Sequence, residues 1–135
     1  MLRMTQIIIK KYLGIDYGTK RIGLSIGDSE TKTAVVFKTV EKIDDIAAII
    51  KEEEIDAVVI GKPYSVANYE HELPDNFKKF INEVHKKLPK EVIVDFEDER
   101  LSSKYADSLP GDKKTKAGRD EIAAVAILQS YFDRN

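Results

Sequence analysis

The sequence of 135 residues contains no cysteine and no apolar run near the roughly 18 residues that a membrane-spanning helix needs. Without cysteine the chain forms neither disulfides nor metal sites with thiolate ligands. Its first residues also lack the longer apolar segment of a secretory signal. We therefore expect a cytoplasmic protein that is not associated with a membrane.

An excess of positive charge is missing as well. The formal net charge is −2, whereas a nucleic-acid-binding protein usually shows a basic surface. The charges are unevenly distributed, however, and local fields can differ in sign from the total. An acidic cluster consists of Asp95, Glu97, Asp98 and Glu99, and a basic cluster consists of Lys113, Lys114, Lys116 and Arg119.

The chain does contain enough apolar material for a core. Hydrophobic residues make up 42% and charged residues 34% of the sequence, a balance that argues against disorder. The length fits one domain of ordinary size. No internal repeat, low-complexity segment or domain boundary is visible, so we expect a single domain over residues 1–135.

Hydrophobic periodicity predicts an α/β fold with a five-stranded mixed sheet. Strands at 6–17, 22–27 and 33–40 alternate or are rich in β-branched residues, which indicates an antiparallel meander. Two right-handed crossovers would add two parallel strands and leave helices on the sheet. The later elements expected are a helix with its apolar stripe from Ile43 and its cap at Asp44 or Asp45, a strand at 55–60, a helix at 74–88, a strand at 92–96, a short helix at 102–109, a loop at 110–118 and a helix at 120–132.

The first strand ends in an unusual way. Asp16 lies between two glycines in the run Leu13-Gly14-Ile15-Asp16-Tyr17-Gly18-Thr19-Lys20. A carboxylate at the tip of a buried strand is costly to desolvate unless something positive meets it, and glycine lets a ligand or another backbone approach closely. The pattern fits a metal or phosphate site, although an aspartate that opens a turn is equally consistent with it.

Two further carboxylates stand at comparable places. Glu99 follows the strand expected at 92–96, and on a regular strand Asp98 and Glu99 point to opposite faces, so only one of them enters a shared site. Asp120 starts the apolar stripe of the last helix. Each has a plain structural alternative. The acidic cluster that contains Asp98 and Glu99 fits a solvated surface, and Asp120 fits a helix N-cap.

If the three acids converge, oxygen ligands favour Mg²⁺ or Mn²⁺. A pair of such ions about 4 Å apart stabilises both the attacking and the leaving oxygen in phosphodiester hydrolysis. Without metal, converging carboxylates repel one another, so at least one pKa should rise. We expect Asp16, Glu99 and Asp120 to lie on the order of 4–7 Å apart.

Four segments together resemble the YqgF/RuvX family. Gly14–Gly23 is similar to its opening motif, 58–63 to its central strand and turn, and 98–103 to its D-E-R-L-S/T motif. The stretch from Asp120 to Phe132 resembles its closing helix. The order and spacing agree, and the resemblance covers essentially the whole chain.

The resemblance implies an RNase H-like fold, related to Holliday junction resolvases of the RuvC type. It implies a nuclease that uses Mg²⁺ or Mn²⁺, with Asp16, Glu99 and Asp120 as catalytic and metal-binding residues. It further implies a role in maturation of pre-16S rRNA, with structured RNA, branched DNA or ribosomal precursor particles as partners. The chain departs from the family at Lys62, where leucine is usual, and after Pro63, where the usual glycine-rich loop is missing.

Several cations stand beside the acids and are candidates for substrate binding. Each has an alternative as a solvated charge or as the partner of a neighbouring acid, and for Arg100 the choice lies between a scissile phosphate and an ion pair. The basic segment near Asp120 could guide a polyanion. The candidates are Lys20, Arg21, Arg100, Lys113, Lys114, Lys116 and Arg119.

Two other functions compete with the nuclease. The Gly-x-Asp-x-Gly-Thr opening also resembles the phosphate loop of actin-like and sugar-kinase ATPases, which place a nucleotide between two domains. A non-catalytic nucleic-acid module is the third reading, and the three acids argue against it. The sequence does not distinguish RNA from DNA as substrate, endonuclease from exonuclease action, or a monomer from a homodimer.

Overall fold

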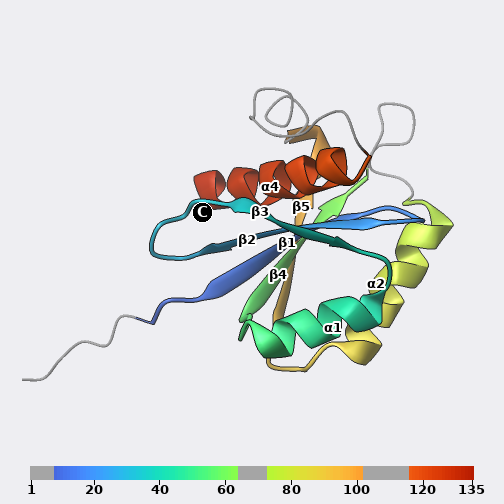
Figure 1. Cartoon of the computed structure of the whole chain (residues 1–135), viewed down its shortest axis with the longest axis horizontal. Helices are drawn as coiled ribbons and strands as arrows, with labels where there is room; N and C mark the ends of the chain where they lie inside the picture. The colour runs from blue at the N-terminus through green and yellow to red at the C-terminus, as the bar shows by residue number, and fades with distance from the viewer. Residues whose placement is uncertain (1–7, 64–72, 102–115) are drawn as a thin grey trace, which may run out of the picture.

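A computed structural model describes residues 8–63, 73–101 and 116–135. It contains the expected five-stranded mixed sheet, with strand order β3-β2-β1-β4-β5 (Figure 1). β1 pairs antiparallel with β2 and parallel with β4, β2 pairs antiparallel with β3, and β4 pairs parallel with β5. The strands are β1 (Lys11–Tyr17), β2 (Ile22–Asp28), β3 (Val35–Val40), β4 (Ala57–Lys62) and β5 (Ile93–Asp98).

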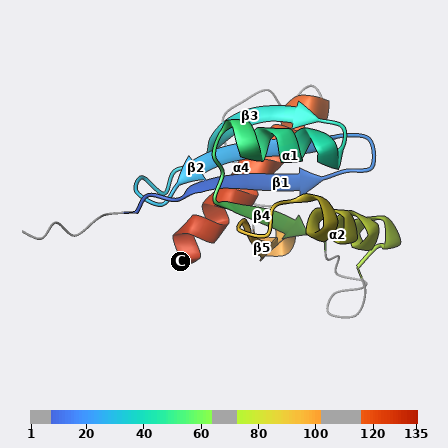
Figure 2. The ribbon, with the colours of Figure 1, turned by 90° about the horizontal axis from the view of Figure 1, so that it is seen from below.

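Helices cover both faces of this sheet. α1 (Ile43–Glu52) and α2 (Asp75–Lys87) lie on one face, and α4 (Lys116–Arg134) crosses the other (Figures 1 and 2). The larger core lies under α1 and α2, where buried isoleucines of α1 meet Phe77 and Phe80 of α2. The smaller core lies under α4 and includes Val59, Ile127 and Leu128. The inner strand β4, between β1 and β5, is buried on both faces, which explains its continuous apolar run.

α4 lies very close to the sheet because the strands beneath it carry small residues. A Cβ atom on Gly14 would come 2.8 Å from the backbone oxygen of Ala124 and 2.8 Å from Cβ of Leu128. The buried Ser25 hydroxyl donates a 2.7 Å hydrogen bond to that same Ala124 oxygen. A Cβ atom on Gly23 would overlap the backbone oxygen of Asp120. These contacts fix the height and the position of α4 over β1 and β2.

Some of the predicted boundaries are wrong. The last helix begins at Lys116 and not at Asp120, so the loop expected at 110–118 ends at least three residues earlier. α1 has its N-cap at Lys42, and the Asp45 carboxylate accepts the Lys42 backbone N–H at 3.3 Å from within the first turn. β5 continues to Asp98. The short helix expected at 102–109 lies outside the described residues, although residues 99–101 are helical.

Within the described part of the chain, no helix is both long enough and apolar enough to cross a membrane. α4, with 19 residues, is the longest helix described, and it has a polar and an apolar face. This agrees with the absence of long apolar runs in the sequence.

The close contact between α4 and the sheet leads to a first prediction. Gly23→Ala should lower the free energy of unfolding by on the order of 1–3 kcal/mol, because the new methyl group forces α4 away from β2. Urea denaturation measures the change, with Lys38→Ala on the exposed side of β3 as the control. Equal stability of Gly23→Ala and the wild type would show that α4 is not held at this distance.

Candidate active site

Asp16 is the sixth residue of β1 and projects toward α4. Its neighbours Ile15 and Tyr17 project to the other face, where the Tyr17 ring stacks on Phe80 with centroids 4.3 Å apart. Alternation along the strand therefore separates the carboxyl group from the larger core. β1 ends at Tyr17, so Asp16 lies near the carboxyl end of this strand and stays partly exposed.

Glycines flank Asp16 on both neighbouring strands. Gly23 of β2 is its direct cross-strand partner. On the other side, Ile15 pairs with Ile60 of β4, so Gly61 lies next to Asp16. Neither neighbour has a side chain, and the space beside Asp16 is filled by groups from elsewhere in the chain.

The space above Gly61 is filled by Ile127 of α4 and by Glu99. A Cβ atom on Gly61 would come 2.9 Å from Cγ of Glu99. Glu99 directly follows β5 and begins the helical residues 99–101, and its side chain is hydrogen-bonded to Asp16. Asp98, one residue earlier, points away and is bound by Arg100. Of these two neighbouring acids, Glu99 is therefore the one that reaches Asp16.

The space above Gly23 is taken by Asp120. It is the fifth residue of α4, so it lies inside the helix and is not the N-cap. Its backbone oxygen and Cβ lie directly over Gly23. The Arg21 side chain approaches its carboxylate, with Nε 3.7 Å from Oδ2. Asp120 is close enough for its charge to act on Asp16.

Asp16 and Glu99 form a hydrogen-bonded carboxyl pair. Burial, then the charge and hydrogen bond of Glu99, then the charge of Asp120 raise the pKa of Asp16 from 3.8 to about 9. Burial also raises the pKa of Glu99, with a further contribution from the charge of Asp98, while the hydrogen bond from Asp16 acts in the opposite direction. The proton of the pair is therefore assigned to Asp16, which donates the hydrogen bond to Glu99. The expectation that at least one pKa rises is met.

The chemistry of the pair can be compared with what a divalent cation requires. Mg²⁺ is typically held by one or two carboxylates together with water and substrate phosphate, and two adjacent carboxyl groups supply such oxygen ligands. The described residues include no three Asp, Glu or His side chains placed to hold a single ion together. The site therefore consists of the Asp16–Glu99 pair with Asp120 beside it, and it fits a divalent cation through the pair.

The expected substrate-binding residues are placed differently from one another. Arg21 contacts Asp120, and Lys20 is exposed in the turn before it. Arg100 forms an ion pair with Asp98, Nη2 to Oδ2 at 2.5 Å, while its own backbone N–H donates to Asp98 Oδ1 at 2.9 Å. Arg119 is exposed on α4. Lys113, Lys114 and the side chain of Lys116 lie outside the described part of the structure.

The role of a second group of acids was not predicted from the sequence, where a solvated surface was the alternative for the acidic cluster. Glu97 is 1% exposed. Its carboxylate accepts hydrogen bonds from Ser130 Oγ at 2.5 Å and from the guanidinium of Arg134, with Nε at 3.2 Å. Asp95 accepts the Tyr131 hydroxyl at 2.5 Å. The i, i+2, i+4 spacing of Asp95, Glu97 and Glu99 was the available signal, because it places all three on the face toward α4.

These bonds tie the end of α4 to β5. Glu97 lies two residues before Glu99, so the network holds the strand from which Glu99 reaches Asp16. A buried carboxylate without partners would be strongly unfavourable. Burial, then Asp95, raises the pKa of the Tyr131 hydroxyl, which keeps it a donor over the physiological range.

Comparisons with known proteins agree with this fold. A model of the family described as "RuvX: Holliday junction resolvase" matches residues 10–134. Two curated relatives carry the name "Putative pre-16S rRNA nuclease": one from Phocaeicola vulgatus is 35% identical over 93% of this chain and 96% of its own, and one from Alcanivorax borkumensis is 36% identical over 89% and 93%. RuvC of Thermus thermophilus in complex with a Holliday junction substrate superposes with a TM-score of 0.59 at 15% identity, over 92% of this chain and 94% of that one. This likeness confirms the expected RNase H-like architecture.

The raised pKa of Asp16 predicts how stability depends on pH without metal. Between about pH 4 and 9 the folded protein keeps the proton that the unfolded chain has released, so stability falls as pH rises, by at most about 1.4 kcal/mol per pH unit. In Asp16→Asn the amide NH2 group can donate the hydrogen bond to Glu99, and no proton is taken up at this position when the variant folds. The variant should exceed the wild type by on the order of 1–3 kcal/mol at pH 8.

Urea denaturation in EDTA at pH 5 and pH 8 measures this difference, which should shrink at pH 5. Glu52→Gln, an exposed acid at the end of α1, is the control and should change neither value. The same pH dependence in wild type and Asp16→Asn would contradict the shared proton.

The buried carboxylate of Glu97 gives another prediction. Arg134→Ala should destabilise the protein by about 2 kcal/mol, because Glu97 then keeps only the neutral Ser130 donor. Glu97→Gln should cost less in the Arg134→Ala background than in the wild type, and a double-mutant cycle in urea measures this coupling. Additive effects would mean that the two side chains do not interact.

Proposed function

The chain belongs to the RuvX family, and from this premise we propose that it is a divalent-metal-dependent nuclease that hydrolyses phosphodiester bonds in the 5′ maturation of pre-16S rRNA. The observation that carries the proposal is the proton shared by Asp16 and Glu99 beside Asp120, near the carboxyl end of β1. A protein has little reason to bring these acids together unless a cation and an anionic substrate meet there. The names of the curated relatives support pre-16S rRNA as the substrate.

Asp16 and Glu99 would hold the cation, Mg²⁺ or Mn²⁺, with Asp120 as the third acid. Such a cation supplies an activated water and stabilises the leaving oxygen. With both carboxyl groups ionised, Asp16 and Glu99 would supply the oxygen ligands of the cation, and the scissile phosphate would lie beside the three acids.

Arg21 is placed to respond to the substrate. Its guanidinium approaches Asp120 at 3.7 Å, a distance longer than a strong ion pair. If Asp120 served as a ligand of the cation, Arg21 would be close enough to contact a phosphate oxygen next to the site. Lys20 in the same turn and Arg119 on α4 add positive charge at the same end of the sheet. The positive charges of these residues would partly offset the negative charges of the acids and so reduce the repulsion of a polyanionic substrate.

Arg100 has a positioning role in this proposal. It holds Asp98 in a bidentate ion pair and lowers the pKa of that carboxyl group, first through its side-chain hydrogen bond. This bond fixes the chain direction between β5 and the helical residues 99–101. Glu99 is consequently directed toward Asp16, while Asp98 stays outside the pair.

The test is a cleavage screen of the purified protein with Mn²⁺ on a pre-16S rRNA 5′ leader, on single strands and on four-way DNA junctions. We expect cleavage of the rRNA precursor, and loss of at least about a thousandfold in Asp16→Asn and Glu99→Gln. Glu52→Gln is the matched control and should cleave at the wild-type rate. Preferred cleavage of junctions would instead assign the protein as a resolvase.

A metal titration separates binding from catalysis. Mn²⁺ should raise the melting temperature of the wild type at pH 7.5 and leave that of Asp16→Asn nearly unchanged, because the variant lacks one anionic ligand. Equal cleavage by Asp16→Asn and wild type would refute the proposed site. Tight binding of ATP in calorimetry, with no cleavage of any substrate, would favour the nucleotide-binding alternative.

A further inference from the structure

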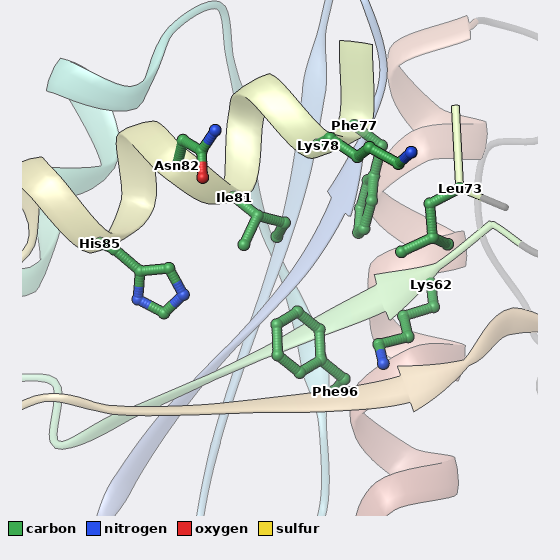
Figure 3. Close-up of a pocket in the computed structure, with 8 residues that line it drawn as sticks. All are labelled: Lys62, Leu73, Phe77, Lys78, Ile81, Asn82, His85 and Phe96. Carbon is green, nitrogen blue, oxygen red and sulfur yellow. The ribbon is translucent and has the colours of Figure 1, made fainter. Parts of the chain in front are cut away.

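A groove of about 480 Å³ lies between α2 and the strands β4 and β5, on the face of the sheet opposite α4 (Figure 3). Its volume is within the range of small-ligand sites. Its walls come from the end of β4, the middle of β5 and one side of α2. The lining residues are Lys62, Leu73, Phe77, Lys78, Ile81, Asn82, His85 and Phe96.

The lining combines an apolar floor with a cationic rim. Phe77, Ile81 and Phe96 form the floor, and Lys62 and Lys78 stand at the rim. None of the described residues that line the groove is acidic, although the chain as a whole has a net charge of −2. An anionic ligand with a flat apolar part matches this lining in both charge and shape.

Phe96 presents an aromatic ring with a cation over one of its faces. Its ring stands up from β5 toward Ile81, and Lys62 Nζ lies 4.7 Å from the ring centroid (Figure 3). The Asn82 side chain, with one acceptor and two donor positions, lies on the α2 wall. A nucleobase would use the ring and the amide, and a phosphate attached to it would use the lysine.

The groove lies close to the carboxyl pair. Lys62 directly follows Gly61, over which Glu99 lies, and Phe96 precedes Glu99 by three residues, about 10 Å along an extended chain. Successive residues alternate between faces, so Phe96 lines the groove while Glu97 faces α4. A single strand of nucleic acid that passes over the ends of β4 and β5 would span the roughly 10 Å from Phe96 to Glu99 with about three nucleotides.

We propose that this groove binds an unpaired nucleotide of the nucleic-acid substrate, its base against Phe96 and Ile81 and its phosphates at Lys62 and Lys78. The proposal deepens the nuclease function and rests on it for the identity of the substrate. It assigns the enzyme to substrates with a single-stranded segment beside the scissile bond. A fully paired duplex would leave the groove empty.

Binding of fluorescein-labelled single-stranded hexanucleotides, measured by anisotropy in EDTA, tests the groove without cleavage. RNA and DNA of the same sequence form two arms, and a blunt duplex forms the third. Phe96→Leu and Lys78→Glu should each weaken single-strand binding about tenfold and leave duplex binding unchanged. Lys86→Glu is the matched control, because it makes the same charge change on the exposed part of α2 outside the groove.

Lys78 is exposed, so Lys78→Glu keeps the test valid even if Phe96→Leu loosens the fold, which a melting curve would reveal. An equal loss in Lys86→Glu, or no loss in either groove variant, would overturn the proposal. Displacement of the hexanucleotide by a hexaglutamate peptide at equal concentration would overturn it in favour of a protein partner. Absence of cleavage in the nuclease assay, with the groove effects intact, would refute the nuclease function and not the groove.

Discussion

Two glycines, Gly23 and Gly61, lie on either side of Asp16 in the sheet, and the candidate site depends on the space that they leave. α4 rests its backbone on Gly23, and the chain after β5 places Glu99 on Gly61. With any side chain at these two positions, Asp120 and Glu99 would be held away from Asp16. The close contact between helix and sheet is therefore a requirement of the site as well as a packing feature.

This arrangement has a cost in stability that other contacts offset. The proton shared by Asp16 and Glu99 makes the metal-free site less favourable as pH rises. The opposite end of α4 is fixed by Ser130 and Arg134 on Glu97 and by Tyr131 on Asp95. The helix is thus held at its far end by satisfied polar groups, while Asp120 at its near end lies beside the unfavourable Asp16–Glu99 pair. Such a distribution is typical of functional sites, where local stability is given up for charge placement.

The sequence allowed the fold to be predicted because the strands and helices follow simple periodicities. Asp16 could be singled out because Gly14 and Gly18 flank it in the sequence, but the acids that join it, Glu99 and Asp120, lie 83 and 104 residues further along the chain. Asp120 was placed at a helix N-terminus because the helix turns before it contain Gly118 and charged residues, which do not continue the apolar stripe. Tertiary contact with β2 overrides that weak local preference. Glu97 looked like a surface acid because its partners, Ser130 and Arg134, are more than thirty residues away.

The net negative charge of the chain is compatible with a polyanionic substrate once the charges are located. Glu97, Asp98 and Asp95 are each engaged by a donor, so their charges are partly offset at short range. The raised pKa of Asp16 keeps a proton on the Asp16–Glu99 pair at neutral pH, so the pair carries less negative charge than two ionised carboxylates. The groove on the opposite face of the sheet has Lys62 and Lys78 at its rim and no acid among its described lining residues. Negative charge is therefore reduced at the carboxyl pair and absent from the described lining of the groove, which is the charge distribution that the proposed binding of a nucleic acid at these two places needs.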